Sequence, residues 1–245
     1  MKRYMNADLH RIFTRVPRYI VLAVLFAAIF FVITQTSEDK TVYEFISGFI
    51  SYVNFFFGVI GLAEFIFVYA DDFKAKTMQV AIGTGISRKR VILTKWAEVA
   101  VLMLIDMLVM ALLIIVAAAA KGVGFTADVA GQFLILLIFG VIKVIGSVGF
   151  TMIFIFWTHN TTVGILIYLV TVSEIVAHLF ESVLEAGFLS SLHISSYTFS
   201  GLMQLSRARM MAGSFNFWYN FGMILYLAAF FFLTCLVFRR RELEF

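Results

Sequence analysis

The chain has 245 residues, of which 62% are hydrophobic and 14% are charged, and its formal net charge is +4. A soluble domain is about 45–50% apolar and about 25% charged, so this composition excludes an ordinary water-soluble protein, whose one core could not bury so many apolar side chains. We therefore predict an integral membrane protein that forms a single domain over residues 1–245.

Residues 1–18 have the pattern of an amphipathic helix. Leu9, Ile12, Phe13 and Val16 recur at helical spacing, while the arginines between them point elsewhere. Such a helix is typical of the cytoplasmic membrane interface, where its basic face meets lipid phosphates. The alternative is an ordinary basic flank of the first membrane span.

Six apolar stretches follow that are suited to crossing a bilayer as helices. A spanning helix needs about 20 apolar residues, and helices are expected because each backbone polar group must be satisfied within its own segment. The sequence therefore predicts an all-α integral membrane fold with six transmembrane helices. The predicted spans are residues 19–33, 45–69, 96–120, 130–157, 162–180 and 217–238.

Lysine and arginine are distributed unevenly between the two sides of these spans. Basic residues gather before the first span, between the second and third, and after the sixth, whereas the other side carries few. Cytoplasmic loops are enriched in Lys and Arg. Both termini are therefore predicted to be cytoplasmic.

The longest predicted cytoplasmic segment, residues 70–95, is patterned as a compact knob. A short helix is expected to end at Gly83 and Gly85, because glycine readily takes the left-handed conformation that ends a helix. Ser87 is a suitable N-cap for a second helix that leads into the third span. We expect this segment to be ordered.

Four ionisable residues fall within or at the ends of the spans, where buried charges need partners. Asp106 and Lys143 lie midway along the third and fourth spans, at similar depth from the turn between them, and they are predicted to form an ion pair. This pair either fixes the helix register or takes part in transport. Glu64 and Glu98, near the cytoplasmic ends of their spans, are expected to pair with basic residues of segment 70–95.

Four further polar residues share one helix face at the outer end of the fifth span. Glu174, His178, Glu181 and Glu185 are spaced at i, i+4, i+7 and i+11. They either line an external portal or form the wet face of a helix that leaves the membrane, and a metal site is disfavoured because no Cys or second His joins them. The apolar segment 181–216 is predicted to form external re-entrant helices between the fifth and sixth spans.

Several motifs of catalytic or nucleotide-binding proteins are missing. The chain has no P-loop sequence for ATP, no H-E-x-x-H and no G-x-S-x-G. We expect no enzymatic activity, no cofactor and no metal in this chain. Nucleic-acid binding is not expected either, because topology accounts for the basic residues.

Segment 70–95 carries residues that together match a known pattern. They are an acidic start (Asp71, Asp72), Thr77, Gly85-Ile86-Ser87-Arg88, Ile92 and Lys95. In these residues the chain resembles the permease subunits of type-2 ABC exporters, a bacterial class that includes drug, lantibiotic-immunity and toxin-peptide exporters. Gly85 stands where many members carry proline. The resemblance extends to the layout: an interfacial helix, six spans, a cytoplasmic knob after the second span and a re-entrant external segment.

The resemblance implies a function. The knob would be a coupling helix that docks on a separate ATP-binding subunit, which binds ATP and Mg²⁺. Two permease chains, identical or related, would enclose a path through the bacterial plasma membrane for an amphipathic or lipophilic peptide or drug. The implied contacts with the ATPase are Phe73, Lys74, Thr77, Met78, Ile82, Ser87 and Arg88.

The competing hypothesis is an ion-coupled secondary transporter or channel. It would use Asp106, Lys143, Glu174 and His178 as a relay of intramembrane charges. Such a protein would transport its substrate without an ATPase. The substrate itself is not encoded in any motif of this chain.

Overall fold

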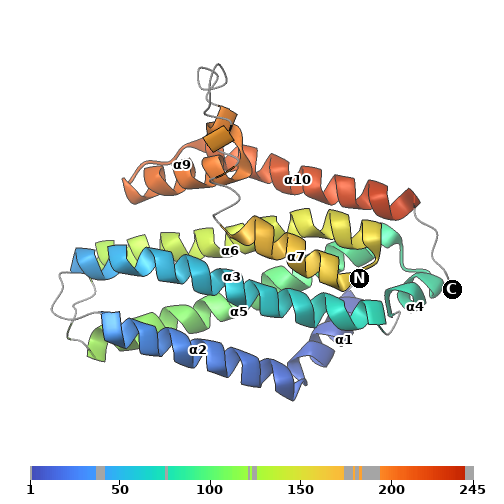
Figure 1. Cartoon of the computed structure of the whole chain (residues 1–245), viewed down its shortest axis with the longest axis horizontal. Coiled ribbons are helices and arrows are strands. Elements are labelled where there is room, and N and C mark those ends of the chain that lie inside the picture. The colour runs from blue at the N-terminus through green and yellow to red at the C-terminus, as the bar shows by residue number, and fades with distance from the viewer. Residues whose placement is uncertain are drawn as a thin grey trace.

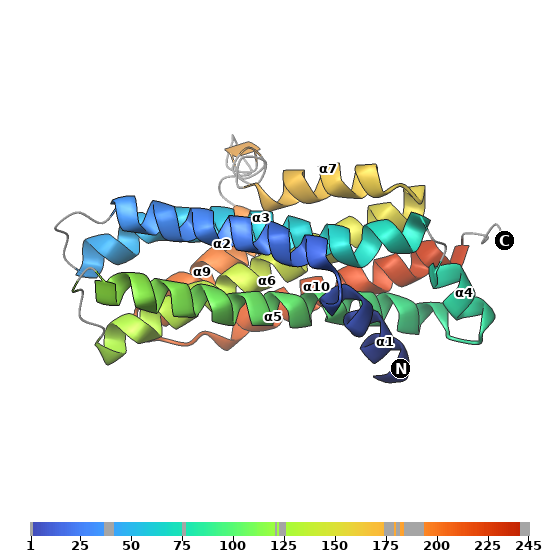
Figure 2. The same cartoon turned by 90° about the horizontal axis from the view of Figure 1, so that it is seen from below.

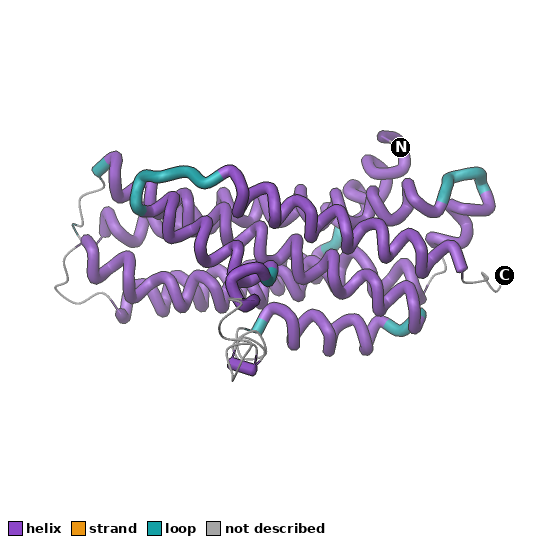
Figure 3. Tube along the Cα trace, turned by 90° about the horizontal axis from the view of Figure 1, so that it is seen from above, coloured by secondary structure: helices purple, strands orange, loops and turns teal. Residues whose placement is uncertain are grey.

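The computed structural model describes residues 2–36, 42–74, 77–120, 122, 126–173, 179, 182–183 and 194–240. Throughout these residues the regular elements are helices, joined by short turns and without a strand (Figure 3). The predicted all-α fold is therefore confirmed for the part of the chain that is described.

The helices follow one another with few residues between them. They are α1 (Lys2–Phe13), α2 (Val16–Thr36), α3 (Val42–Lys74), α4 (Thr77–Gly83), α5 (Arg88–Ala120), α6 (Ala127–Thr158), α7 (Thr161–Val172), the short 3-10 helix η2 (Ile194–Tyr197), α9 (Phe199–Met211) and α10 (Phe217–Arg240).

The described chain has four helices long and apolar enough to cross a membrane, or five if α1 and α2, bent by 64° at their junction, count as one span. This indicates a multi-pass membrane protein. The number six stays a prediction. Of the expected span 162–180, α7 covers only the first part, and most residues beyond Ser173 lie outside the described chain. The four helices are Tyr52–Ala70 within α3, Arg88–Ala120, Ala127–Thr158 and Phe217–Arg239.

Helix α6 lies at the centre of the bundle and contacts α3, α5, α7, α9 and α10. Glycines allow this close packing, because without a Cβ the helix backbones can approach one another. Gly61 of α3 faces Val144 of α6 and the hydroxyl of Tyr168, and Gly140 of α6 faces the ring of Phe57. The Tyr168 hydroxyl also donates a hydrogen bond of 3.1 Å to a backbone carbonyl of α3.

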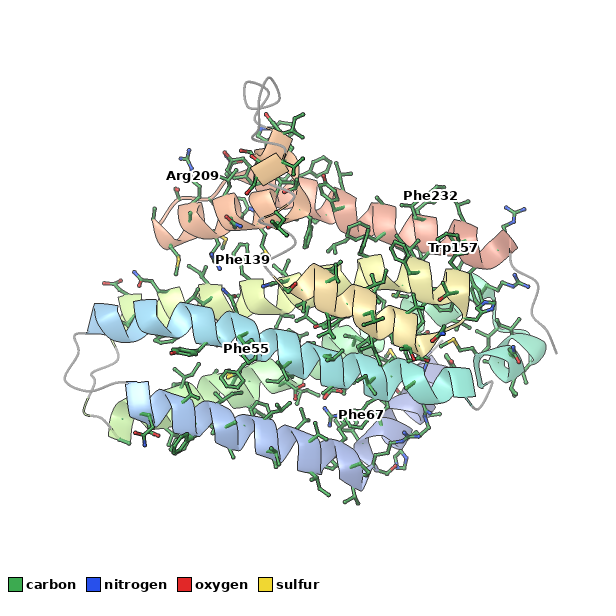
Figure 4. The ribbon with its side chains drawn as sticks, in the orientation of Figure 1. Phe55, Phe67, Phe139, Trp157, Arg209 and Phe232 are labelled. Carbon is green, nitrogen blue, oxygen red and sulfur yellow. The ribbon has the colours of Figure 1, made fainter. Side chains whose placement is uncertain are left out.

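Helix α9 lies antiparallel to the first part of α10. Ser206 donates to the Asn220 side chain at 3.1 Å, and the Tyr226 hydroxyl donates to the Tyr197 carbonyl at 2.8 Å. Phe139 of α6 packs with Leu202 and Met203 of α9 and Met223 of α10, and it lies between α6 and these two helices (Figure 4). Part of the predicted re-entrant segment thus packs on the bundle, whereas residues 184–193 lie outside the described chain.

The two ends of the bundle differ in what they carry. The start of α1, the knob helix α4 and the end of α10 lie at one end, which we call the α4 end (Figures 1 and 2). The end of α2, the start of α3, the end of α5 and the start of α6 lie at the other end (Figures 1 and 2).

We expect Gly61→Ala to lower the free energy of unfolding by about 1–3 kcal/mol, because the new methyl group would overpack a filled contact. A Cβ at this position would lie 2.5 Å from a methyl carbon of Val144. Thermal unfolding in detergent, followed by tryptophan fluorescence, measures the change. Gly131→Ala is the matched control, since Gly131 is helical with no atom within 4 Å of its added Cβ. Equal effects of the two substitutions would contradict the packing argument.

Candidate functional site

The knob between α3 and α5 is a short helix closed by a glycine turn. Helix α4 ends at Gly83, and Gly85 has a positive φ of 94°. The amide of Ile86 donates to the Ala81 carbonyl at 3.1 Å, as expected when a left-handed residue ends a helix. Ser87 occupies the N-cap position of α5, and its carbonyl accepts hydrogen bonds from the amides of Arg90 and Val91. The predicted glycine break and the new helix start are both present.

Helix α4 packs one apolar face against the bundle and leaves Val80 and Thr84 exposed, and these two residues are called the tip of the knob. Met78 is buried and Ile82 packs against the main core, whereas Val80 is 64% exposed and Thr84 is also exposed. Of the predicted ATPase contacts, Met78 and Ile82 therefore hold the knob to the bundle. Ser87 lies on the exposed turn.

The remaining predicted contacts fall at the junction of α3 and α4 and at the start of α5. Phe73 and Lys74 end α3 and Thr77 begins α4, but their side chains lie outside the described part. Arg88 has an intramolecular partner. Its Nη1 donates to the Phe238 carbonyl at 2.7 Å and to the Arg239 carbonyl at 3.3 Å, at the end of α10.

A buried ion-pair network begins two helical turns further along α5. Lys95, which is fully buried, contacts the Asp8 carboxylate of α1 and lies 3.2 Å from Glu98. Arg11 binds the same Asp8 carboxylate at 2.6 Å. Burial raises the pKa of Asp8, but Lys95 and Arg11 outweigh it and hold that pKa below its ordinary value. Helix α1 is thereby fastened to α5.

A second group of charges joins α2, α3 and α5. Arg18 binds Glu64 through two nitrogens, with Nη2 at 2.7 Å and Nε at 2.9 Å from the same carboxylate oxygen. The same Nη2 lies 3.8 Å from Asp106. All three side chains are buried. The guanidinium also lies 5.1 Å from the ring centroid of Phe13, so it is enclosed by aromatic as well as acidic groups.

This network fastens helices together rather than presenting a reactive centre. In a low-dielectric interior each charge must be matched by a partner, and removing one partner is far more costly than removing both. The described residues contain no group of His, Cys, Asp and Glu side chains that could hold a metal ion. The geometry suits a mechanical role, in which several helices keep fixed positions relative to α5.

The predicted pair of Asp106 with Lys143 stays a prediction. The charged groups that the structure places around Asp106 are Arg18 and Glu64, from two other helices. Lys143 is buried on α6, on the same face as Gly146, which meets the Phe199 ring of α9.

The α6 face toward α5 lies elsewhere on the helix. It includes Leu134 and Leu137, which share an apolar cavity with Ala111 and Ile114 of α5. It also includes Gly149, which faces Trp96 of α5. By helical spacing, Lys143 lies on a different side of α6 from these residues.

The expectations for Glu64 and Glu98 have different outcomes. Glu98 lies beside Lys95, the last residue of segment 70–95, as predicted. The prediction for Glu64 is wrong, because its described partner is Arg18 at the start of α2. A sequence signal existed, since Arg18 directly precedes an apolar run and Glu64 interrupts one.

The polar stripe of Glu174, His178, Glu181 and Glu185 lies outside the described residues.

Comparison with models of known protein families, with curated proteins and with solved structures gave no match. A function is therefore assigned from the residues of the chain itself. The features available for this are the ordered knob, its exposed tip and the ties that connect α5 to the rest of the bundle.

We expect Arg18→Gln to destabilise the protein by about 3–5 kcal/mol, because two carboxylates would remain buried without their cation. Asp106→Asn should cost less than about 1 kcal/mol, since Arg18 lies 3.8 Å from it and binds Glu64 more closely. The double variant Arg18→Gln/Glu64→Gln should regain part of the loss. Thermal unfolding in detergent measures all three, and equal costs for the two single changes would rule out this ranking.

We expect the stabilising effect of Asp8 to depend on pH. Because its pKa is lower in the folded protein than the ordinary 3.8, its contribution is fully present above pH 3.8 and is lost as the pH falls through the folded pKa. Asp8→Asn should therefore lower the melting temperature equally at pH 7 and pH 5. A cost that already shrinks between those values would show that the Asp8 carboxylate is not held by Lys95 and Arg11.

Proposed function

We propose that this chain is the transmembrane permease subunit of an ATP-driven exporter of the type-2 ABC class. A separate ATP-binding subunit docks on the α4 end, and its motion is passed through α5 to the other helices. The observation that carries this proposal is an ordered knob with an exposed tip, built directly onto a helix that is fastened to several others. Motion of rigid bodies about such a contact is a common means of switching.

The tip of the knob is suited to a protein partner. Val80 is exposed on α4 and Thr84 directly after it, and Lys89 and Arg90 are exposed at the start of α5. A small apolar contact flanked by basic groups fits a cleft with acidic residues, because charge complementarity favours encounter and orientation. The turn at Gly85, with its positive φ, supports the resemblance to the coupling segment of these permeases.

The first turns of α5 connect the knob to distant parts of the chain. Arg88 reaches the end of α10, Lys95 reaches α1, and the Trp96 indole donates to the Ile145 carbonyl of α6 at 3.1 Å. A push on the knob therefore acts on three helices through direct contacts. This is the connection that a permease without its own ATPase requires.

The remaining parts of the proposal follow from the same class. ATP and Mg²⁺ are bound by the partner subunit, and a second permease chain completes the path for the substrate. The cargo is amphipathic or lipophilic, such as a peptide or drug, and an apolar cavity of about 260 Å³ between α5 and α6 is compatible with such chemistry. The protein lies in the bacterial plasma membrane with both termini, and the α4 end, in the cytoplasm.

An ion-coupled transporter is the second candidate, because Arg18, Glu64 and Asp106 form a buried charged group inside the bundle. Intramembrane charges are typical of ion and proton pathways. Transport by the purified chain without an ATPase would favour this candidate. Transport that requires the ATPase and ATP would favour the exporter.

The proposal predicts that a neighbouring gene encodes a P-loop ATPase that co-purifies with this chain. We expect Arg90→Glu to reduce the recovered ATPase by about tenfold. Arg209→Glu is the matched control, since Arg209 is also exposed but lies on α9 (Figure 4). It should leave the recovery unchanged. Failure of the unsubstituted chain to bind the ATPase would refute docking at the α4 end. Equal losses of recovered ATPase for Arg90→Glu and Arg209→Glu would refute it as well.

A further inference from the structure

Arg88 joins two segments that are far apart in the sequence. It is the first residue of α5, directly after the knob, and its guanidinium contacts the last turn of α10. In addition to its hydrogen bonds to two carbonyls, the group lies 5.4 Å from the centroid of the Phe238 ring. Phe238 is itself buried, and the centroid of its ring lies 4.6 Å from the ring centroid of Phe156 in α6.

The contact provides hydrogen-bond donors for carbonyl groups at the C-terminal end of α10. The last carbonyls of a helix have no intrahelical donor, and a cation near them is favoured by the helix dipole. Arg88 supplies both a donor and a positive charge at this point. Its neighbours Lys89 and Arg90 carry the same charge but are exposed, so the contact depends on the position of Arg88 rather than on net charge alone.

We propose that Arg88 is a positioning residue that clamps the end of α10 to the corner between α4 and α5, so that this corner and the last helix move as one body. This assigns Arg88 an intramolecular role in place of the ATPase contact that the resemblance implied. The clamp is a property of the chain alone, whereas its use in export rests on the proposed function.

The chain contains a natural reporter of this clamp. Cys235 is the only cysteine, lies on α10 three residues before Phe238 and is a half-buried free thiol. Lys89 is near enough to act on the thiol electrostatically. If the end of α10 separates from α5, this thiol becomes more accessible to a maleimide.

The experiment compares maleimide labelling of the full chain in nanodiscs, without an ATPase. Arg88→Gln should label at least about threefold faster than the unsubstituted chain, because the helix end loses its cationic donor. Lys89→Gln is the matched control: it removes an equal charge beside Cys235 but leaves the clamp. Its rate should be no faster than that of the unsubstituted chain, because maleimide reacts with the thiolate and a nearby cation favours that form. Cys235→Ser should not label.

A second measurement separates a local clamp from a general loss of stability. Hydrogen exchange in Arg88→Gln should increase in the last turns of α10 but not in the middle of α6. Arg88→Lys, which keeps the charge but loses the planar fork, should also label faster than the unsubstituted chain. Unchanged labelling in both Arg88 variants, acceleration equal to that of Lys89→Gln, or faster exchange throughout the bundle would each overturn the proposal.

These outcomes are independent of the proposed function. The clamp is tested in the isolated chain, whereas docking is tested by recovery of the ATPase. Loss of the clamp with normal docking, or docking failure with an intact clamp, would each be visible.

Discussion

The enclosure of the Arg18 guanidinium by α2, α3 and α5 is the contact on which the packing of the first half of the chain depends. A cation with almost no access to water must keep its carboxylate partners close, so Glu64 and Asp106 fix where three helices meet. The junction between α1 and α2 lies just before Arg18, and the 64° bend there brings α1 back toward α5. Lys95 then holds α1 through Asp8. Two buried cations thus determine how four helices are arranged.

Helix α5 is the element that these contacts have in common. Within its first half it meets α10 through Arg88, α1 through Lys95 and α6 through Trp96. The knob precedes this helix without an intervening linker, because Gly85 reverses the chain and Ser87 begins the next helix at once. Structural support and a route for motion therefore coincide in the same residues.

Much of the fold could be predicted from the length of apolar stretches, because lipid leaves helices as the stable form for an isolated segment. A helix start could also be predicted where a cap is present: Ser87 was expected to begin the helix that leads into the third span, and α5 begins at Arg88. The side of a helix that meets a given neighbour could not be predicted, because it depends on how all the helices rotate to bury their glycines and charges. For this reason the Arg18–Glu64 pair was missed, whereas Glu98 was expected to pair with a basic residue of segment 70–95 and lies beside Lys95, three residues before it on the same helix.

The glycine contacts of α6 limit which movements the bundle allows. At Gly61 and Gly140 the facing side chains fill the space that a Cβ would occupy, so α3 and α6 are interlocked at these two positions. Sliding or rolling one past the other would drive side chains into backbone. By contrast, only 17% of the spanning window of α10 is buried. The close contact of α3 with α6 therefore favours rearrangements of the bundle in which these two helices stay together.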